Sequence, residues 1–422
     1  MTTTIFTEMS FFCYQIGVNF VETAGMIIEY NPMHTGHLHL LRQTRAALGA
    51  DTAVIGVMSG NFVQRGDFAL LGRQARARAA VESGLDLVLE LPLPWAISSA
   101  EGFADGAVEI LESTGLVTYL AFGSECADIP ALMETAACLR SECYRGHLRR
   151  FLDQGLPFAV CRQMAAETIL GAQRAALLKS PNNNLGVEYC KALLARRSGI
   201  RPLAVLRTGD AHDCETPQGE HPSASAIRAL LRAGESARAL DLMTPAMARA
   251  YREEEAAGRA PIFSEVCERA VLARLRSMEE TDFAALDSGR EGLGNRLYRA
   301  SRSAATLLEL LEAAKTKRYA YARLRRLVLW AYLGLTPSDV PERVPYLRVL
   351  AANAAGRGLL ARMRRTAAVP VLTKPADVRC LSGHAQALFH LEVRAADLYT
   401  LAYPDLAAAK GGSAWREGPV IL

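Results

Sequence analysis

The sequence predicts an α/β domain built on a doubly wound, mostly parallel sheet, followed by an all-helical domain. Short apolar runs alternate with amphipathic helical patterns up to about residue 234. Beyond that point alanine, leucine and arginine dominate, and helical periodicity continues to Tyr403. A chain of 422 residues also exceeds one ordinary hydrophobic core. We therefore expect two domains, 21–234 and 235–422.

Composition excludes several classes of protein. The net charge of +4 is mild, and 22% charged residues is ordinary for a soluble globular chain. Nine cysteines without a CxxC pair predict neither a zinc site nor a disulfide framework, which favours a cytoplasmic location. No apolar run approaches the roughly 20 residues of a membrane span. Residues 1–20 lack signal-peptide features, and we expect them to be disordered or to precede the authentic start near Val21.

The most informative stretch is 25–41, where an apolar strand meets a helix. Met26–Ile28 is a buried strand pattern, Pro32 helps to end it, and His34-Thr35-Gly36-His37 opens a helix. A helix N-terminus presents unpaired N–H groups and partial positive charge, and two imidazoles can donate beside it. A chance HxGH sequence is expected about once in a hundred chains of this length. The stretch therefore predicts a phosphate site.

Four further strands are expected to bring ligand-binding groups to the same sheet edge, because ligands of open α/β sheets bind at the carboxyl ends of the strands. The strands are 51–58, 85–91, 117–122 and 202–206, and the last two are followed by Gly123 and Arg207.

Two charged residues near these strands have open roles. Arg65 follows the second strand, and it is either a phosphate or carboxylate ligand or an ordinary solvated arginine. Glu90 lies inside the third apolar run, where it either contacts ligand or magnesium or has a structural role, and the structural role is slightly favoured.

Two polar helix starts are further candidates. The asparagines of 179–186 precede a helix expected from Val187, and they can cap it or read the edge of a nucleotide base. Ser223, Ser225 and Arg228 begin another helix and could hold the β- and γ-phosphates of a nucleotide. The alternative is an ordinary N-cap followed by a surface arginine.

The second domain carries two basic runs, 315–326 and 357–365. The first has six basic residues in twelve, interleaved with two tyrosines, and neither run contains an acidic residue. Single runs of this kind are often solvated faces. Two in one domain favour a partner with a phosphate backbone.

Eight segments in series resemble the bacterial tRNA(Met) cytidine acetate ligase family, a member of the HxGH nucleotidyltransferase superfamily. They are GMIIEYNPMHTGH, VMSGNFVQRG, DLVLELP, FGSE, SPNNNLGVEY, SASAIR, KTKRYAYARLRR and EVRAADLY. The resemblance implies a Rossmann-like nucleotidyltransferase domain followed by the helical domain. It also implies an ATP-dependent ligase that activates acetate as acetyl-adenylate and acetylates N4 of the wobble cytidine of elongator tRNA(Met).

The resemblance and the residue patterns together define the expected site. His34 and His37 are the expected catalytic residues. Expected ATP contacts are Ile27, Glu29, Tyr30, Asn31, Pro32, Gly36, Leu40, Gly123, Asn182, Asn183, Arg207, Ser223, Ser225 and Arg228, with the choice between Asn182 and Asn183 open. Expected tRNA contacts are Lys315, Lys317, Arg318, Arg323, Arg325 and Arg326. Mg²⁺ is expected through the phosphates rather than a protein metal site, and neither a membrane nor a protein partner is expected.

Two other functions compete with this one. A small-molecule nucleotidyltransferase making a nucleotide cofactor would use the same HxGH turn, but it gives no reason for the basic helical region. A non-enzymatic RNA-binding protein with a degenerate nucleotide fold would not need the HxGH and SxSxIR segments.

Overall fold

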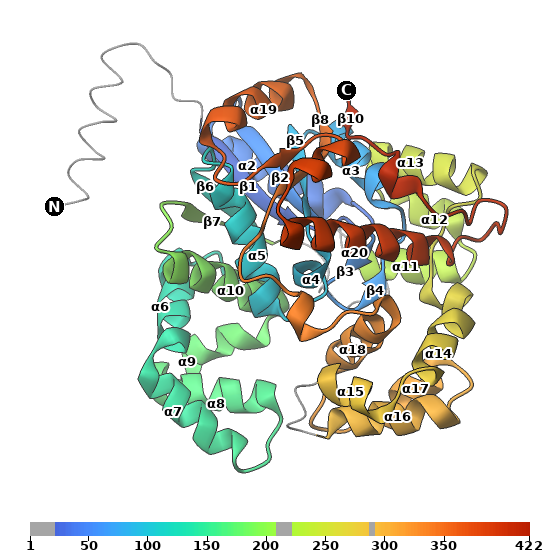
Figure 1. Cartoon of the computed structure of the whole chain (residues 1–422). Helices are drawn as coiled ribbons and strands as arrows, with labels where there is room; N and C mark the ends of the chain where they lie inside the picture. Colours follow the sequence, from blue (N-terminus) through green and yellow to red (C-terminus); the bar gives the residue numbers. More distant parts are fainter. Residues whose placement is uncertain (1–21, 208–221, 287–291) are drawn as a thin grey trace.

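The computed structural model describes residues 22–207, 222–286 and 292–422. The predicted terminal segment 1–20 and the loop after Arg207 lie outside these residues. The chain forms one mixed sheet in the order β10-β8-β5-β2-β1-β6-β7, with β9 paired to β8, and helices cover both faces (Figure 1). The strands of the sheet are β1 (Thr23–Ile28), β2 (Ala53–Ser59), β5 (Leu87–Leu91), β6 (Tyr119–Ser124), β7 (Arg201–Leu206), β8 (Leu347–Ala352), β9 (Val371–Leu372) and β10 (Val420–Ile421). A separate hairpin is made by β3 (Phe62–Val63) and β4 (Asp67–Phe68).

The sheet has a topological switch point beside β1. From β1 the chain builds outward through β2 and β5 on one side, and it then returns to add β6 and β7 on the other. All of these strands pair in parallel. Their carboxyl ends therefore share one edge, and a crevice for ligand is expected where the order reverses. The predicted α/β class with a mostly parallel sheet is confirmed.

Helices of the first half pack on this sheet or extend from it. They are α2 (Thr35–Leu48), α3 (Arg73–Glu82), α4 (Leu93–Ala96), α5 (Ala100–Ser113), α6 (Ile129–Arg140), α7 (Glu142–Leu152), α8 (Phe158–Leu170), α9 (Ala172–Ala175), α10 (Pro181–Arg196) and α11 (Ala224–Arg232).

Helices also make up much of the second half of the chain. They are α12 (Ser236–Asp241), α13 (Pro245–Ala256), α14 (Glu268–Arg276), α15 (Glu280–Leu286), α16 (Leu293–Ser303), α17 (Leu307–Ala314), α18 (Tyr321–Leu333), α19 (Ala354–Thr366) and α20 (Gly383–Thr400). In Figure 1 the groups α6–α9 and α14–α18 lie below the sheet on either side of the view.

The second half differs from the all-helical prediction. β8 runs antiparallel to β5, with Glu90 opposite Arg348, and β9 and β10 both pair in parallel with β8. All six residues of β8, LRVLAA, are buried. A short apolar run of this composition cannot be distinguished from a buried helical segment by periodicity. The chain beyond residue 234 therefore completes the sheet as well as forming helices.

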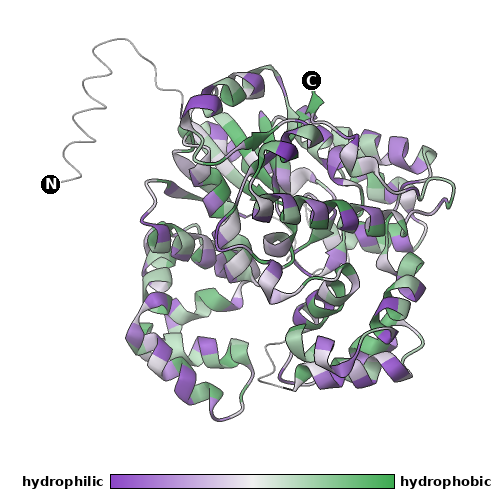
Figure 2. Cartoon of the chain, in the orientation of Figure 1, coloured by the Kyte–Doolittle hydropathy of each residue, from purple (hydrophilic) through white to green (hydrophobic). Residues whose placement is uncertain are grey.

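The hydrophobic core is divided by the sheet into two clusters. Ile55 and Val57 of β2 belong to the cluster that contains residues of α5, α10 and α20. Val54 and Met58 of the same strand belong to the cluster with α2, α3, α11 and α13. This alternation is the period of two expected of a strand buried on both faces. Figure 2 shows the strands as largely hydrophobic, whereas the outer helices carry both kinds of residue. None of the helices in the described ranges is both long and apolar enough to span a membrane.

Candidate active site

The two predicted catalytic histidines form the start of α2. His34 is the N-cap, and its Nδ1 accepts the Gly36 N–H at 3.1 Å. The His34 N–H in turn donates to Nδ1 of His37 at 3.2 Å. This reciprocal arrangement is a capping box in which two histidines replace the usual hydroxyl and carboxylate side chains. Because both Nδ1 atoms accept, the neutral imidazoles carry their protons on Nε2, where each ring can donate to a ligand.

These histidines border a cavity of about 980 Å³ at the carboxyl ends of the strands. Its size is at the upper end of the range for ligand pockets. The first half of the chain and helices α14, α17 and α18 of the second half both contribute to its wall. The predicted residues that line it are Ile27, Glu29, Tyr30, Asn31, His34, Gly36, His37, Leu40, Gly123, Asn182, Arg207, Ser223, Ser225 and Arg228. Pro32 and Asn183 are buried and are not part of the wall.

The two asparagines left open by the sequence have different environments. Asn182 lines the cavity, and its Oδ1 lies 3.4 Å from Nη1 of Arg207. Asn183 is 3% exposed, and its Oδ1 accepts from the Ser124 hydroxyl at 2.6 Å and the Glu125 N–H at 2.9 Å. Asn183 therefore holds β6 to α10, whereas Asn182 lies at the cavity wall.

The asparagine segment also differs from its predicted structure. Residues 181–184 are the first turn of α10, which begins at Pro181 rather than at Val187. Pro is well tolerated at this position because its missing N–H needs no partner there. The carboxylate of Glu125 accepts the N–H groups of Asn182 and Asn183 at 3.0 and 2.6 Å. Burial alone would raise the pKa of Glu125, but the hydrogen bond from the Asn182 side-chain amide at 2.8 Å and these backbone hydrogen bonds lower it below its ordinary value.

Glu29 and Asn31 shape the cavity through their side chains. Oε1 of Glu29 accepts from the Ser59 hydroxyl at 3.2 Å and the Gln64 N–H at 2.7 Å. Oδ1 of Asn31 accepts the Leu70 N–H at 2.7 Å. Both residues thus tie the end of β1 to the loop that follows β2.

The SxSxIR segment forms the start of α11. Ser223 is the N-cap and accepts the Ala226 N–H at 3.0 Å, as the alternative interpretation expected, but Arg228 is half-buried rather than a surface arginine. Arg228 donates to the Asn31 carbonyl at 2.6 Å and to the Ser225 hydroxyl at 3.2 Å. Burial lowers the pKa of Arg228, and burial also lowers that of Arg207. Two desolvated guanidinium groups at one cavity wall favour an anionic ligand.

Most residues that distant segments contribute to the cavity wall were not predicted from the sequence. Gln64 and Asp67 of the β3–β4 hairpin line the cavity, and Glu268 and Tyr332 do so from the second half. Glu268 and Tyr332 have no local signal, because their proximity to the site depends on how the second half folds back, whereas Gln64 and Asp67 flank Arg65 after β2. Arg65, whose role was open, also lines the cavity.

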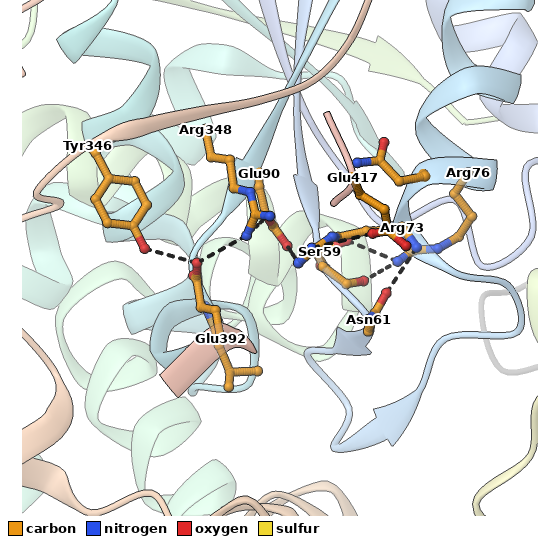
Figure 3. Close-up of polar contacts among 12 residues, drawn as sticks. Ser59, Asn61, Arg73, Arg76, Glu90, Tyr346, Arg348, Glu392 and Glu417 are labelled. Atoms are coloured by element: carbon orange, nitrogen blue, oxygen red, sulfur yellow. Dashed lines mark hydrogen bonds and ion pairs between the residues drawn. The ribbon is translucent and has the colours of Figure 1, made fainter. Parts of the chain in front are cut away.

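Glu90 has the structural role that was slightly favoured (Figure 3). It is 4% exposed and lies 3.1 Å from Nη1 of Arg73 and 3.4 Å from Nη1 of Arg348. Glu392 of α20 approaches the same Arg348 nitrogen at 3.7 Å and accepts the Tyr346 hydroxyl at 2.9 Å. This buried network joins β5, α3, β8 and α20, and Glu90 is not part of the cavity wall.

The two basic runs lie on different parts of the molecule. The first leads into α18, which packs against α14, α15, α17 and α20. The second lies on α19, which packs against β2, β5 and β8 (Figure 1). Within the first run Lys317, Arg318 and Arg325 are exposed, and Arg325 also reaches the cavity wall. Lys315, Arg323 and Arg326 are half-buried.

Among the described residues, the acidic residues that line the cavity are Glu29, Asp67, Glu265 and Glu268. In the part of the chain that the structure describes, no three His, Cys, Asp or Glu side chains form a group that could hold a metal ion. The Asp67 carboxylate lines the cavity, and its Oδ1 accepts the Phe68 N–H at 2.8 Å.

Comparisons with known proteins identify the family. A model of the HIGH Nucleotidyl Transferase family matches residues 21–413. The tRNA(Met) cytidine acetate ligase of Acetivibrio thermocellus is 35% identical, over 95% of this chain and 100% of that protein. The corresponding ligase of Caldicellulosiruptor saccharolyticus is 36% identical, over 91% and 95% of the two chains.

Two solved structures support the same family. Thermotoga maritima TmcAL in its apo form superposes with a TM-score of 0.91 at 31% identity, covering 95% of this chain and 99% of that one. The same protein bound with alpha-thio ATP gives a TM-score of 0.89 with the same coverage. This chain therefore belongs to the tRNA(Met) cytidine acetate ligase family of HIGH nucleotidyl transferases.

Proposed function

We propose that this protein is an ATP-dependent ligase that activates acetate as acetyl-adenylate and then acetylates N4 of the wobble cytidine of elongator tRNA(Met). The observation that carries the proposal is the cavity at the sheet switch point, bordered by the paired histidines of α2 and by Arg207 and Arg228. Full-length relatives of this name support the acetate and tRNA specificity. We place the reaction in the cytoplasm, because its proposed substrate is a tRNA.

The first step is attack by an acetate oxygen on the α-phosphorus of ATP, which forms the mixed anhydride and releases pyrophosphate. Positioning and charge stabilisation dominate such reactions. The Nε2–H groups of His34 and His37 donate to phosphate oxygens as negative charge grows, and the N-terminus of α2 adds its partial positive charge. Arg228 holds the departing phosphates, while Asn182 and Arg207 contact the nucleoside end.

Mg²⁺ would accompany ATP and neutralise part of the phosphate charge when bound. The cavity offers the Asp67 carboxylate as an oxygen donor, which fits the preference of Mg²⁺ for one or two carboxylates together with substrate phosphates.

The second step joins the acetyl group to the tRNA. The exocyclic amine of the unstacked cytidine attacks the acetyl carbonyl carbon, loses a proton, and AMP leaves with the electron pair of the broken anhydride bond. Exposed basic residues of the 315–326 run, which include Lys317, Arg318 and Arg325, contact the tRNA backbone. The cation of Lys315 lies 5.3 Å from the ring centre of exposed Tyr321 and extends this surface, whereas that of half-buried Arg323 lies 5.5 Å from the ring centre of buried Tyr319.

The decisive experiment is exchange of labelled pyrophosphate into ATP. We expect exchange that requires acetate, because adenylate formation is reversible. ATP consumption without any acetate requirement, and with a nucleotidylated product, would instead support the small-molecule nucleotidyltransferase. Transfer of labelled acetate to tRNA(Met), compared with a transcript whose wobble cytidine is replaced by uridine, tests the second step.

A further inference from the structure

The β3–β4 hairpin lies directly on the first turns of α18, although more than two hundred residues separate them in the chain. Gly66, at the turn of the hairpin, has φ +76°. A Cβ atom on Gly66 would lie 2.4 Å from the backbone N of Arg326 and 2.6 Å from the carbonyl C of Arg325. Only glycine allows both the conformation and this close approach.

The side chain of Arg326 reinforces the same contact. Its Nη1 donates to the Gln64 carbonyl at 3.2 Å, so the guanidinium bonds to the hairpin. The side chain is half-buried, whereas Lys317 and Arg318 of the same run are exposed. Burial, together with nearby Arg323, lowers the pKa of Arg326 to about 10, and the group stays charged at neutral pH.

The other side of the hairpin is fixed by the nucleotide-binding half. The Gln64 N–H donates to the Glu29 carboxylate. The Ala69 N–H donates to the Asn61 carbonyl at 2.9 Å, which joins the two ends of the hairpin. Buried Arg76 donates to the carbonyl of Ser59 at 3.1 Å and to that of Gly60, at the start of the loop (Figure 3). The hairpin is thus held at its base by the sheet and at its tip by α18.

This placement matters because the hairpin forms part of the cavity wall. Gln64, Arg65, Gly66 and Asp67 all line it, and Arg325 lines it from α18. A shift of the hairpin tip would therefore move these side chains relative to a bound nucleotide.

We propose that Arg326 is a positioning residue for the nucleotide site, which with Gly66 seats the hairpin on α18, and that it is not a tRNA backbone contact. The proposal rests on ATP binding in the cavity, as in the proposed function. It assigns to Arg326 a role different from that of the exposed basic residues in the same run.

The test uses the full-length protein and four variants. Arg326→Gln removes the charge, Arg326→Lys keeps a donor within reach of the Gln64 carbonyl, and Gly66→Ala disturbs the same contact without changing any charge. Arg364→Gln, an exposed arginine on α19, is the matched control. ATP affinity is measured by equilibrium binding without acetate or tRNA, exchange kinetics give KM and kcat, and tRNA affinity is measured over a range of salt concentrations.

We expect Arg326→Gln and Gly66→Ala to weaken ATP binding by at least about tenfold, because small displacements of binding groups have effects of this order or larger. Arg326→Lys should restore part of the loss. The tRNA affinity and its salt dependence should match those of the wild type, and Arg364→Gln should bind ATP normally. Should Arg326→Gln fail to fold, Arg326→Lys and Gly66→Ala decide the question.

The opposite pattern would overturn the proposal: unchanged ATP affinity in Gly66→Ala and both Arg326 variants, or a loss of tRNA affinity with a shallower salt slope in Arg326→Gln. Failure of the proposed function is a separate outcome. In that case the wild type binds ATP but shows no acetate-dependent exchange, and the comparison of ATP affinities still tests the positioning role.

Discussion

Glu392 of α20 provides a sharp test of the buried network because its pKa is strongly perturbed. The residue is 5% exposed, and its carboxylate accepts the Leu93 N–H at 3.2 Å and the Tyr346 hydroxyl at 2.9 Å. Burial is the largest influence and neighbouring Glu90 is the second, and together they raise the pKa of Glu392 to about 7. Arg348 and Arg73 oppose this change by favouring the charged form.

The sign of the stability effect follows from this direction. In the unfolded chain the Glu392 carboxyl loses its proton near its ordinary pKa of 4.5, whereas in the folded protein it keeps the proton up to about pH 7. Between these values the folded state binds more protons, so the contribution of Glu392 to the free energy of unfolding falls as pH rises. The difference between the two values corresponds to at most roughly 3–4 kcal/mol at about 1.4 kcal/mol per pH unit.

We predict that Glu392→Gln removes this loss. The glutamine carbonyl can still accept the Leu93 N–H, and the side chain cannot ionise. Urea unfolding of wild type and variant at pH 5, 6, 7 and 8 gives the difference between their free energies of unfolding. That difference should move in favour of the variant by about 1–3 kcal/mol between pH 5 and pH 8.

Glu90→Gln is a useful companion variant. It removes the negative charge of Glu90 while leaving the burial of Glu392 unchanged. The pH range over which the free energy of unfolding falls should then shift to lower pH. A stability difference between wild type and Glu392→Gln that is constant from pH 5 to pH 8 would refute the reasoning. So would a difference that moves in favour of the wild type, because Arg348 would then control the ionisation of Glu392.

Four further predictions concern a site histidine, the two neighbouring asparagines and the first basic run. His37→Ala should lower acetate-dependent exchange by about 10²–10³ through loss of a phosphate donor, with tRNA affinity in a filter-binding assay unchanged. Asn182→Ala should raise KM for ATP in the exchange assay without loss of stability. Asn183→Ala should destabilise the protein by about 1–3 kcal/mol in urea unfolding, because the buried Ser124 hydroxyl and the Glu125 N–H lose their acceptor. Lys317→Glu combined with Arg318→Glu should weaken tRNA binding and reduce the salt slope by about 2 while leaving ATP binding unchanged, and an unaltered slope would remove these residues from the interface.

Local patterns were sufficient for the part of the site that one segment builds. His34 and His37 lie at a strand-to-helix turn, where the direction of the helix axis and the ends of its hydrogen-bond ladder are determined by neighbouring residues. Ser223 could be recognised as a helix start for the same reason. Such features depend on interactions a few residues apart, which a single sequence contains.

Features that depend on distant segments could not be predicted in this way. The position of Asn183 depends on Ser124 of β6, and that of Arg326 depends on the Gln64 carbonyl. β8 was missed because an alanine- and leucine-rich run of six residues fits either a strand or a helix. Its pairing with β5 is what decides between them.

The antiparallel pairing of β5 with β8 has a consequence for synthesis of the chain. β5 ends at Leu91 and β8 begins at Leu347, so at about 5–20 residues per second the ribosome needs roughly 10–50 s to supply the partner of β5. During this interval the growing sheet has an open edge at which a strand from another chain could add. A charged residue within an apolar edge strand disfavours such addition. Glu90 occupies this position, and its cross-strand partner Arg348 is among the residues that finally cover the edge.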